Sequence, residues 1–481
     1  MSFVSFVFPV FLAIAFCLYW FVFGRNLRWQ NAFVVLASYV FYGWWDWRFL
    51  ILIAFTTLCS WASGLLIGRF RGSPRKARVI SAANIVVNLG ILVLFKYYDF
   101  FAQSFADMFL GGRSEGLLLH LILPVGISFY TFQALSYSID VYRGRIDPVR
   151  DVMQFFAFVS FFPQLVAGPI ERATHLLPQF GRSRAFDYSL AVDGLRQILW
   201  GYFKKIIVAD SCAVYVDDIF AHPQAFSGTQ LIAGALFFTF QIYGDFSGYS
   251  DIAIGSAKLF GIRLEQNFRI PYFSRNIAEF WRRWHISLMT WFRDYLYIPL
   301  GGSRGSKAKV IRNTFLVFLL SGLWHGANWT FMAWGAYNAL LFLPLILSGS
   351  TRKFRDDIVP GRLLPSWKDF LRMLLTFILV MLGWILFRSD SIAEAAGYFI
   401  RMWQWGPGSG LDFLLTGPFL IRIVWIVVLV IVEWLTRSNS HVLSMNGIRS
   451  RSARYVIYIV IIALIILFAD NTAPNFIYFQ F

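Results

Sequence analysis

The sequence has few charged residues: they make up 14% of its 481 positions, whereas a soluble domain carries about 25%. Hydrophobic residues account for 58% of the chain, and the mean hydropathy is +0.59. A chain this long with so few charges would not stay in water, so the composition excludes an ordinary soluble globular protein. It indicates a polytopic integral membrane protein that is in contact with membrane lipid.

Cysteine is scarce as well. Cys17, Cys59 and Cys212 lie in apolar or mixed contexts and show no paired spacing. This excludes a disulfide framework and a zinc pattern, and it favours small buried hydrophobic side chains. We expect neither a metal nor a permanently bound cofactor. Internal repeats of 20–50 residues and low-complexity linkers are also missing, so one membrane-embedded domain is predicted over residues 1–481.

Apolar runs that are long enough to cross about 30 Å of hydrocarbon recur along the whole chain. They lie near 2–23, 31–45, 49–67, 79–96, 116–138, 151–171, 191–219, 229–262, 313–348, 367–388, 412–435 and 455–470. Because some runs are short or interrupted, we predict an all-α bundle of roughly ten to twelve spanning helices, together with re-entrant and interfacial helices.

The formal net charge of +17 comes from 43 basic and 26 acidic residues. The basic residues gather in short loops: Arg69, Arg71, Arg75, Lys76 and Arg78; Arg352, Lys353, Arg355 and Arg362; Arg437, Arg449, Arg451 and Arg454. Such loops are held on the cytoplasmic side of a membrane. The positive charge therefore reports multi-pass topology and not nucleic-acid binding, and counting crossings from these loops predicts that both termini are extracytoplasmic.

The amino-acid composition changes twice along the chain. Residues 1–138 read as plain spanning helices with short loops, and residues 351–481 read as further spans followed by an aromatic tail. Between them, residues 139–350 mix apolar runs with prolines, glycines and charges. Broken helices at membrane depth are tolerated only where they are buried in protein or line an aqueous cavity. We therefore expect the functional site in this middle part.

The first candidate segment, EFWRRWHISLMTWFRDYLYIPLGG, begins at Glu279. From Ile277 to Tyr295 apolar residues follow each other at spacings of four and three, which predicts one amphipathic helix with Asn276 as its N-cap. On that helix Arg282 and Arg293 fall on one flank, and His285 lies between the flank and the apolar stripe. Two interpretations are open: an interfacial helix anchored by tryptophans, or the wall of a site.

The second candidate segment is LSGLWHGANW, which contains Trp324, His325 and Asn328 at the end of a long apolar run. Glycines on both sides of the histidine leave space for another chain or a ligand. Histidine is the side chain whose ordinary pKa suits proton transfer near neutral pH. The alternative is a buried histidine that is hydrogen-bonded to a neighbouring helix.

Two carboxylates, Asp245 and Asp251, stand in the apolar segment QIYGDFSGYSDIAIG. Such groups are costly within a membrane unless they are paired. We expect a structural role, in which Asp245 and Asp251 pair with Arg282 or Arg293, in preference to catalysis.

The loop PLGGSRGSKAK is rich in glycine and carries Arg304 and Lys307. It lacks the spacing of a P-loop, but its backbone N–H groups and its charges would suit a phosphate-bearing ligand. Anchoring on the cytoplasmic face explains the same residues equally well.

These segments resemble the membrane-bound O-acyltransferase (MBOAT) family. The likeness is carried by DFSGYSDIAIG, NFRIPYFSRNIAEFWRRWHISLMTWFRDYLYIPLGG and GLWHGANWTFMAWGAYNA, and it extends to FYGWWDWRFL, GISFYTFQALSYSIDVYRG and FPQLVAGPIERATHLLPQF. It covers most of residues 30–340. Within the family it is most similar to the bacterial branch that includes the alginate O-acetylation membrane protein, whose relatives act in peptidoglycan and cellulose O-acetylation and in teichoic-acid D-alanylation.

The resemblance implies a helical bundle around a central tunnel, where a cytoplasmic funnel meets an outer funnel near an invariant histidine. His325 corresponds to that histidine, and His285 corresponds to the second histidine of the family. The implied donor is acetyl-CoA, which enters from the cytoplasm across a bacterial inner membrane. An extracytoplasmic acetyltransferase of the SGNH type, with other polysaccharide-modification proteins, would complete the transfer.

These correspondences give each candidate residue an expected role. His325 is expected to act as general base on an acceptor hydroxyl, and His285 is expected to line the site. Six further residues become candidates for binding the donor or substrate, alongside the two carboxylates: Arg282, Arg293, Arg304, Lys307, Trp324, Asn328, Asp245 and Asp251.

The aromatic end of the sequence, NFIYFQF, has two interpretations: a membrane-interface belt, or insertion into a cavity. The D-alanylation relatives have a similar aromatic motif on a small partner protein. By that analogy Tyr478 is a candidate carrier for the acetyl group.

The expected function is transfer of acetyl to an extracytoplasmic polysaccharide, with an alginate-type polymer favoured and peptidoglycan next. A transporter or lipid flippase is one alternative, although such proteins often show repeated halves and this sequence does not. A non-catalytic scaffold of an envelope complex is the other alternative, and it would tolerate loss of both histidines.

Overall fold

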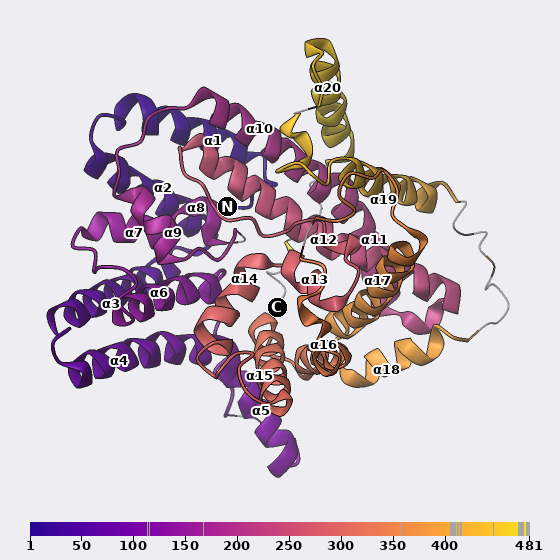
Figure 1. The fold of residues 1–481 in the computed structure, drawn as a ribbon, viewed down its shortest axis with the longest axis horizontal. Helices are drawn as coiled ribbons and strands as arrows, with labels where there is room; N and C mark the ends of the chain where they lie inside the picture. The colour runs from indigo at the N-terminus through magenta and orange to yellow at the C-terminus, as the bar shows by residue number, and fades with distance from the viewer. Residues whose placement is uncertain are drawn as a thin grey trace. The chain divides into compact units, whose positions relative to one another are not determined.

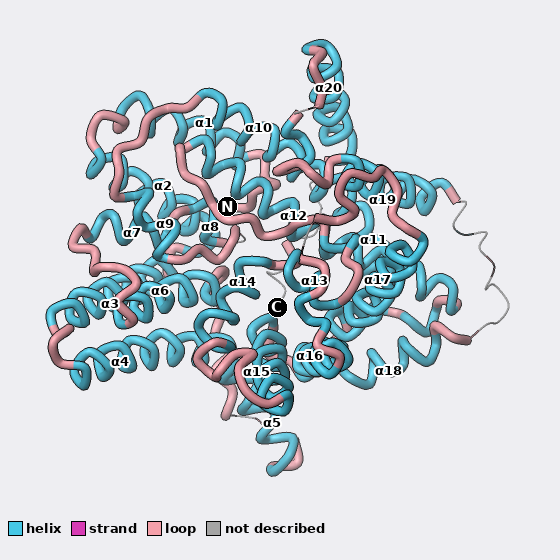
Figure 2. The backbone as a smooth tube through the Cα atoms, viewed as in Figure 1, coloured by secondary structure: helices cyan, strands magenta, loops and turns pink. Residues whose placement is uncertain are grey.

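The computed structural model describes residues 1–481 except 113, 115, 167, 356, 405–409, 411–412, 414–415, 446, 470–475 and 478–481. The candidate carrier Tyr478 lies outside the described residues. In the described part, helices are the only regular secondary structure, and loops join them (Figure 2). The prediction of an all-α chain is therefore confirmed.

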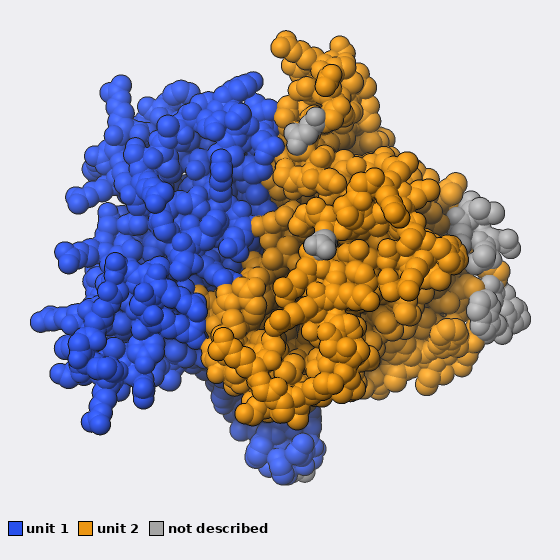
Figure 3. All heavy atoms as spheres, in the orientation of Figure 1, with its two compact units in different colours: residues 1–195, 253–265 blue, residues 196–252, 266–481 orange. Residues whose placement is uncertain are grey.

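The chain divides into two compact units (Figure 3). Unit 1 comprises Met1–Leu195 and Ala253–Glu265, and unit 2 comprises Arg196–Ile252 and Gln266–Phe481. Two helices contribute residues to both units: α10 (Tyr188–Tyr202) and α12 (Gly228–Leu259).

Unit 1 contains the N-terminal helices of Figure 1. They are α1 (Val7–Cys17), η1 (Leu18–Val22), α2 (Leu27–Asp46), α3 (Phe49–Arg69), α4 (Pro74–Leu92), η2 (Val93–Tyr97), α5 (Tyr98–Phe109), α6 (Ile127–Tyr142), α7 (Val152–Ser160), α8 (Phe162–Leu165) and α9 (Ala173–Phe180).

Unit 2 contains the elements that carry both candidate histidines. They are η3 (Phe203–Asp210), α11 (Ser211–Ala221), η4 (Pro223–Ala225), η5 (Pro271–Phe273), α13 (Ile277–Arg283), α14 (Ile286–Phe292), η6 (Arg293–Tyr297), α15 (Lys307–His325), α16 (Trp329–Leu347), η7 (Ser350–Arg352), α17 (Trp367–Arg388), α18 (Ile392–Arg401), α19 (Gly417–Leu435), η9 (Val442–Ser444) and α20 (Arg451–Phe468).

Five helical segments of the described chain are long and apolar enough to cross a membrane. They are Phe49–Arg69, Pro74–Phe109, Trp329–Leu347, Trp367–Arg388 and Arg451–Phe468. Each overlaps an apolar run that the sequence predicted to span. Several spans on one chain are what a multi-pass membrane protein requires.

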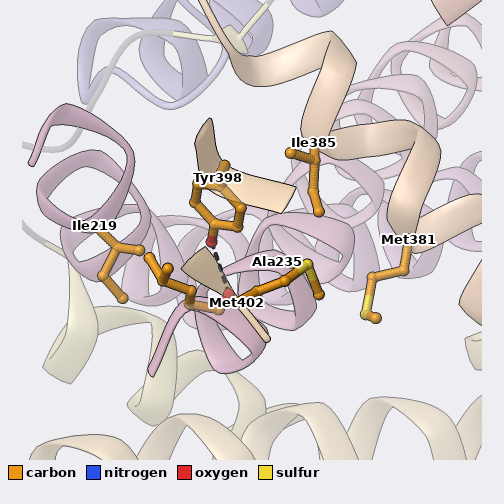
Figure 4. Close-up of a cluster of buried hydrophobic side chains, with 7 residues drawn as sticks. Ile219, Ala235, Met381, Ile385, Tyr398 and Met402 are labelled. Carbon is orange, nitrogen blue, oxygen red and sulfur yellow. Dashed lines mark hydrogen bonds between the residues drawn. The ribbon is translucent and has the colours of Figure 1, made fainter. Parts of the chain in front are cut away.

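A hydrophobic cluster holds four helices of unit 2 together. Its buried members come from α11, α12, α17, α18 and the residue after α18: Ile219, Leu231, Ala235, Met381, Ile385, Tyr398 and Met402 (Figure 4). The hydroxyl of Tyr398 donates a hydrogen bond of 2.6 Å to the carbonyl oxygen of Leu231 on α12. The cluster therefore fixes α17 against α12, and both of these helices carry aromatic side chains that contact a candidate histidine.

Candidate functional site

The helix predicted over residues 277–295 is broken at its histidine. α13 ends at Arg283 and α14 begins at Ile286, and between them His285 adopts left-handed backbone angles, φ 43° and ψ 53°. The prediction of one continuous helix was wrong, because the apolar spacing persists across a break that hydrogen bonds from another segment impose. The predicted N-cap is confirmed, since the Asn276 side chain accepts a 2.8 Å bond from the Glu279 amide.

The break is held by a segment that runs beside it. The Ile286 amide donates to the Asn267 carbonyl oxygen at 2.9 Å, and the Arg269 amide donates to the Arg283 carbonyl oxygen at 2.9 Å. A non-glycine residue in the left-handed region costs about 1–3 kcal/mol and persists where its surroundings over-determine it. These two backbone bonds, one on each side of His285, supply that constraint.

The Asn267 side chain is the hub of the site. Its Oδ1 atom accepts from the His285 ring at 3.0 Å and from the Ser287 hydroxyl at 2.8 Å, while its Nδ2 atom donates to the Ser250 hydroxyl at 3.1 Å. A carboxamide oxygen only accepts, so His285 donates from Nδ1 and its Nε2 carries a lone pair. Among the described residues, no group hydrogen-bonds to that buried Nε2.

Burial determines the charge of this ring. His285 is 1% exposed, and desolvation lowers its pKa from 6.5 to about 3. A ring with that pKa stays neutral throughout the physiological range. His285 thus presents an unprotonated nitrogen that can accept a hydrogen bond from a hydroxyl group.

His325 is the last residue of α15, and glycines place it. A Cβ atom on Gly322 would lie 2.2 Å from the Phe331 carbonyl oxygen, and one on Gly335 would lie 2.4 Å from the Phe318 carbonyl oxygen. Only glycine at both positions allows the backbones of α15 and α16 to approach so closely. The approach brings the end of α15 against the side chains of α16.

The two histidines lie together inside an aromatic box, although forty positions separate them in the sequence. Their ring centroids are 6.4 Å apart, and His325 is only 3% exposed. The indole ring of Trp324 contacts both, at 5.8 Å from His285 and 5.0 Å from His325. Trp334 of α16 and Phe387 of α17 contact His325 edge-to-face, at 5.2 Å and 5.3 Å.

A cavity of about 500 Å³ lies beside this box, in unit 2. Arg282 and Arg293 both line it, together with Ile286, the residue that follows His285. Trp281 also lines it and contacts Trp334, with ring centroids 5.5 Å apart. Two tryptophans, Trp281 and Trp334, therefore link the wall of the cavity to His325.

The arginines at this cavity also have structural partners. Arg282 donates to the carbonyl oxygens of Thr351, Lys353 and Phe354, and Arg293 pairs with its neighbour Asp294 at 2.7 Å. The sequence expected Arg282 or Arg293 to pair with Asp245 or Asp251, and that expectation was wrong.

Of the other predicted positions, Arg304 and Lys307 are exposed and Asn328 is half-buried. Arg304 is exposed in the glycine-rich loop, whose neighbouring Ser303 lines the cavity. Lys307 donates to the Leu347 carbonyl oxygen at 2.8 Å. Asn328 caps α16 by accepting from the Thr330 amide at 3.0 Å, so the structure places it as a helix cap.

Comparison with known proteins identifies relatives of this chain. Residues 149–378, which include both histidines, match the model of the membrane-bound O-acyltransferase family. A probable alginate O-acetylase, AlgI, of Pseudomonas aeruginosa is 41% identical over 79% of this chain and 71% of its own length. A peptidoglycan O-acetyltransferase of Helicobacter pylori is 36% identical over 78% and 73%, and a teichoic acid D-alanyltransferase of Bacillus subtilis is 28% identical over 56% and 69%.

The chain belongs to the MBOAT family. It is accordingly an acyltransferase and a multi-pass membrane protein, and the relatives named above are bacterial. Within this MBOAT chain, no group of three or more His, Cys, Asp or Glu residues in the described part could hold a metal ion.

Two lysines of the MBOAT chain are the partners that the sequence reasoning missed. Lys204 pairs with Asp251 at 2.6 Å, and Lys205 pairs with Asp245 at 2.9 Å. Both lysines stand in the apolar run GYFKKIIVAD, and adjacent ionisable residues within a predicted span are themselves a signal of function or pairing.

A glycine spacing also pointed to these partners. A Cβ atom on Gly244 would lie 2.8 Å from the Lys204 carbonyl oxygen, and one on Gly248 would lie 2.7 Å from the Gly201 carbonyl oxygen. Glycines four residues apart are a recurrent signature of close helix packing in membranes. Here they bring the lysine-bearing segment against α12.

Part of the aromatic tail is buried beside His285. Phe476 is 0% exposed and Ile477 is 2% exposed. The Phe476 ring lies 4.2 Å from that of Tyr249 and 6.0 Å from that of Phe246, and Phe246 contacts His285 at 4.7 Å. For these two residues, insertion into the protein is the interpretation that the structure confirms.

Proposed function

We propose that this acyltransferase takes acetyl from cytoplasmic acetyl-CoA and passes it outward for O-acetylation of an extracytoplasmic polysaccharide. The observation that carries the proposal is the buried histidine pair, whose rings lie 6.4 Å apart next to a cavity with two arginines. An alginate-type polymer is the favoured final acceptor, because the probable alginate O-acetylases are more similar than the peptidoglycan enzyme.

The proposed chemistry uses the two histidines in different ways. His325 takes the proton of an acceptor hydroxyl as that oxygen attacks the thioester carbonyl carbon. The new ester C–O bond forms, the C–S bond breaks, and the thiol leaves with the proton from the imidazolium. His285, neutral and held at Nδ1 by Asn267, accepts a hydrogen bond at Nε2 and orients the acceptor.

The donor is proposed to occupy the cavity beside the box. Its volume of about 500 Å³ falls within the usual range of small-molecule sites, about 300–1,000 Å³. Arg282 and Arg293 would bind the donor phosphates, with Arg304 and Lys307 of the nearby loop as further contacts. Trp324 would line the place where thioester and acceptor meet, because its ring touches both histidines.

The finer topology also belongs to the proposal. Ten to twelve crossings, with re-entrant segments around a tunnel, would place the protein in a bacterial inner membrane with both termini outside. An SGNH-type acetyltransferase on that side would then receive the acetyl group. The short elements within predicted apolar runs, such as α7 and α8 in run 151–171, favour re-entrant segments.

Substitution of His325 tests the catalytic role. His325→Ala should lower the O-acetyl content of the polymer made by cells by about 10²–10⁴-fold, the usual contribution of a general base. Membrane abundance and the elution volume in detergent should stay as in the wild type. Normal acetylation by a folded His325→Ala protein would exclude the acyltransfer mechanism and favour a transporter or scaffold.

We also propose that the hydroxyl of Tyr478 carries the acetyl group between the cytoplasmic donor and the outer enzyme. The burial of Phe476 and Ile477 supports this, because it brings the preceding residues near His285. Tyr478→Phe removes the hydroxyl alone, so polymer O-acetylation should fall to the level of His325→Ala. Wild-type acetylation in that variant would exclude the carrier.

A further inference from the structure

In the part of the tail that the structure describes, a polar contact joins Ile477 to the bundle. The amide of Ile477 donates a 2.7 Å hydrogen bond to Oδ2 of Asp245, a buried carboxylate on α12. The other oxygen of that carboxylate lies 2.9 Å from Nζ of Lys205. A hydrogen bond to an ionised acceptor is roughly twice as strong as one between neutral groups.

The lysine holds this carboxylate in place. Nζ of Lys205 also bonds to Asp210 at 2.6 Å and lies over the Tyr249 ring, 5.7 Å from its centroid. Asp210 and Lys205 belong to η3, which the Gly244 and Gly248 contacts press against α12. The position of the carboxylate is thus set by packing, independently of the tail.

The same face of α12 supplies the other residues that contact the tail, which together with Asp245 form its seat. Asp245, Phe246 and Tyr249 are spaced so that they share one side of the helix. The Phe476 ring packs against the rings of Phe246 and Tyr249, while the amide of Ile477 bonds to the carboxylate. The edge of Phe246 in turn meets His285, so the seat and the histidine site share one aromatic residue.

We infer that Asp245, held by Lys205, is the anchor that fixes the register of the tail on α12 beside the histidine site. The inference rests on the proposed function for its consequence. A hydrogen bond to the amide of Ile477 fixes the position of the residue that directly precedes Tyr478. A shift of the tail by one residue along α12 would put Phe479 or Ile477 in the place of the carrier. Asp245 is therefore a positioning residue.

Hydrogen–deuterium exchange of the full chain in detergent micelles tests the anchor directly. Asp245→Asn leaves Lys205 paired with Asp210 and replaces the ionised acceptor by a neutral one. Exchange of the peptide that contains Ile477 should become about tenfold faster, the cost of reducing a charge-assisted bond to a neutral one. The matched control is Asp251→Asn, which removes a lysine-paired carboxylate on the same helix and should leave this peptide unchanged. Unchanged exchange in Asp245→Asn would overturn the inference.

A tail substitution covers the case in which Asp245→Asn does not fold. Ile477→Pro removes the donated N–H and leaves every bundle side chain intact. The Phe476 amide should exchange faster in Ile477→Pro than in the control Ile477→Val, and equal rates would overturn the inference. Because both changes act on the same hydrogen bond, Asp245→Asn with Ile477→Pro should speed exchange at Phe476 no more than Ile477→Pro alone, whereas independent effects would multiply.

The hypothesis of the Asp245 anchor and the hypothesis of the Tyr478 carrier can be refuted independently of each other. Tyr478→Phe should keep the slow exchange of the Ile477 peptide while it abolishes polymer O-acetylation. If Asp245→Asn speeds exchange but Tyr478→Phe acetylates normally, the anchor stands and the carrier falls. If exchange is insensitive to Asp245 while Tyr478→Phe is inactive, the carrier stands and the anchor falls.

Discussion

Substitution of Asn267 tests whether its side chain positions the His285 ring, because the carboxamide bonds to that ring and has no proposed part in the chemical step. The carboxamide is fully buried and makes three hydrogen bonds, to His285, Ser287 and Ser250. At about 0.5–1.5 kcal/mol each, Asn267→Ala should lower the free energy of unfolding by about 1.5–4.5 kcal/mol. The backbone bond from the Ile286 amide to the Asn267 carbonyl survives the change, so the break between α13 and α14 should persist.

The catalytic effect follows from the lost hydrogen bond to Nδ1. Without it the His285 ring is free to change tautomer and orientation, which should raise the activation free energy by about 1–2 kcal/mol, or a factor of about 5–30 in rate. This loss is smaller than that expected for His325→Ala, since the base itself remains. Release of free thiol from acetyl-CoA by the purified protein with its acceptor, and polymer O-acetyl content in cells, measure the effect.

The control is a buried asparagine that touches neither histidine. Asn88 in unit 1 is also fully buried, and its side chain donates to Ser60 and to Asn84. Asn88→Ala should lower the thermal unfolding temperature by a comparable amount but leave the rate per folded molecule unchanged.

A double substitution decides whether Asn267 acts through His285. Asn267→Ala with His285→Ala should be no slower than His285→Ala alone. Rates that multiply in the double variant, or a wild-type rate in Asn267→Ala, would refute the positioning argument.

Two other features of the fold lead to predictions. Gly322→Ala places a Cβ 2.2 Å from the Phe331 carbonyl oxygen, so it should separate α15 from α16 and reduce polymer acetylation at least about tenfold. The control is Gly397→Ala on α18, where a Cβ would meet open space. This change should raise the free energy of unfolding by about 0.5–1 kcal/mol. Equal activity and melting temperature in both variants would contradict this reading of the helix contact. The hydrogen bond to Glu171 raises the pKa of His175 above 6.5, so its stabilising contribution is full below pH 6.5 and is lost as pH rises through the raised pKa. The thermal unfolding temperature should therefore fall more between pH 6 and pH 9 in the wild type than in His175→Gln. Parallel curves of unfolding temperature against pH in the two proteins would contradict the pairing.

The sequence predicted best those features that depend on residues close together along the chain. A histidine between glycines at the end of an apolar run marked His325, and apolar spacing marked the helices around His285. Spacing could not reveal the break at His285, because the bonds that impose it come from Asn267 and Arg269, and a hydrophobic period carries no record of such tertiary contacts. Asn267 itself stood in the quoted NFRIPYF segment and went unnoticed, since a lone asparagine has no distinguishing pattern.

The assignment of charge partners failed for a different reason. Arg282 or Arg293 is the expected partner of Asp245 and Asp251, whereas the observed partners, Lys204 and Lys205, come from an apolar run some forty positions earlier. Gly244 and Gly248 on α12 let that run approach closely, and their spacing was readable in the sequence. The division into N-terminal spans, core and C-terminal spans stays a prediction.

The buried ion pairs on α12 are better explained by function than by stability. Replacing a buried ion pair by well-packed apolar residues is often neutral or stabilising, because desolvation offsets the attraction between the charges. Stability alone therefore gives no reason for α12 to present Asp245 and Asp251 to two lysines. Asp245 has a further partner, the Ile477 amide, and an apolar side chain could not accept that bond. A charged anchor is useful where the tail must be held in one register and still be released, since a single charge-assisted bond specifies a position without the area that would make it permanent.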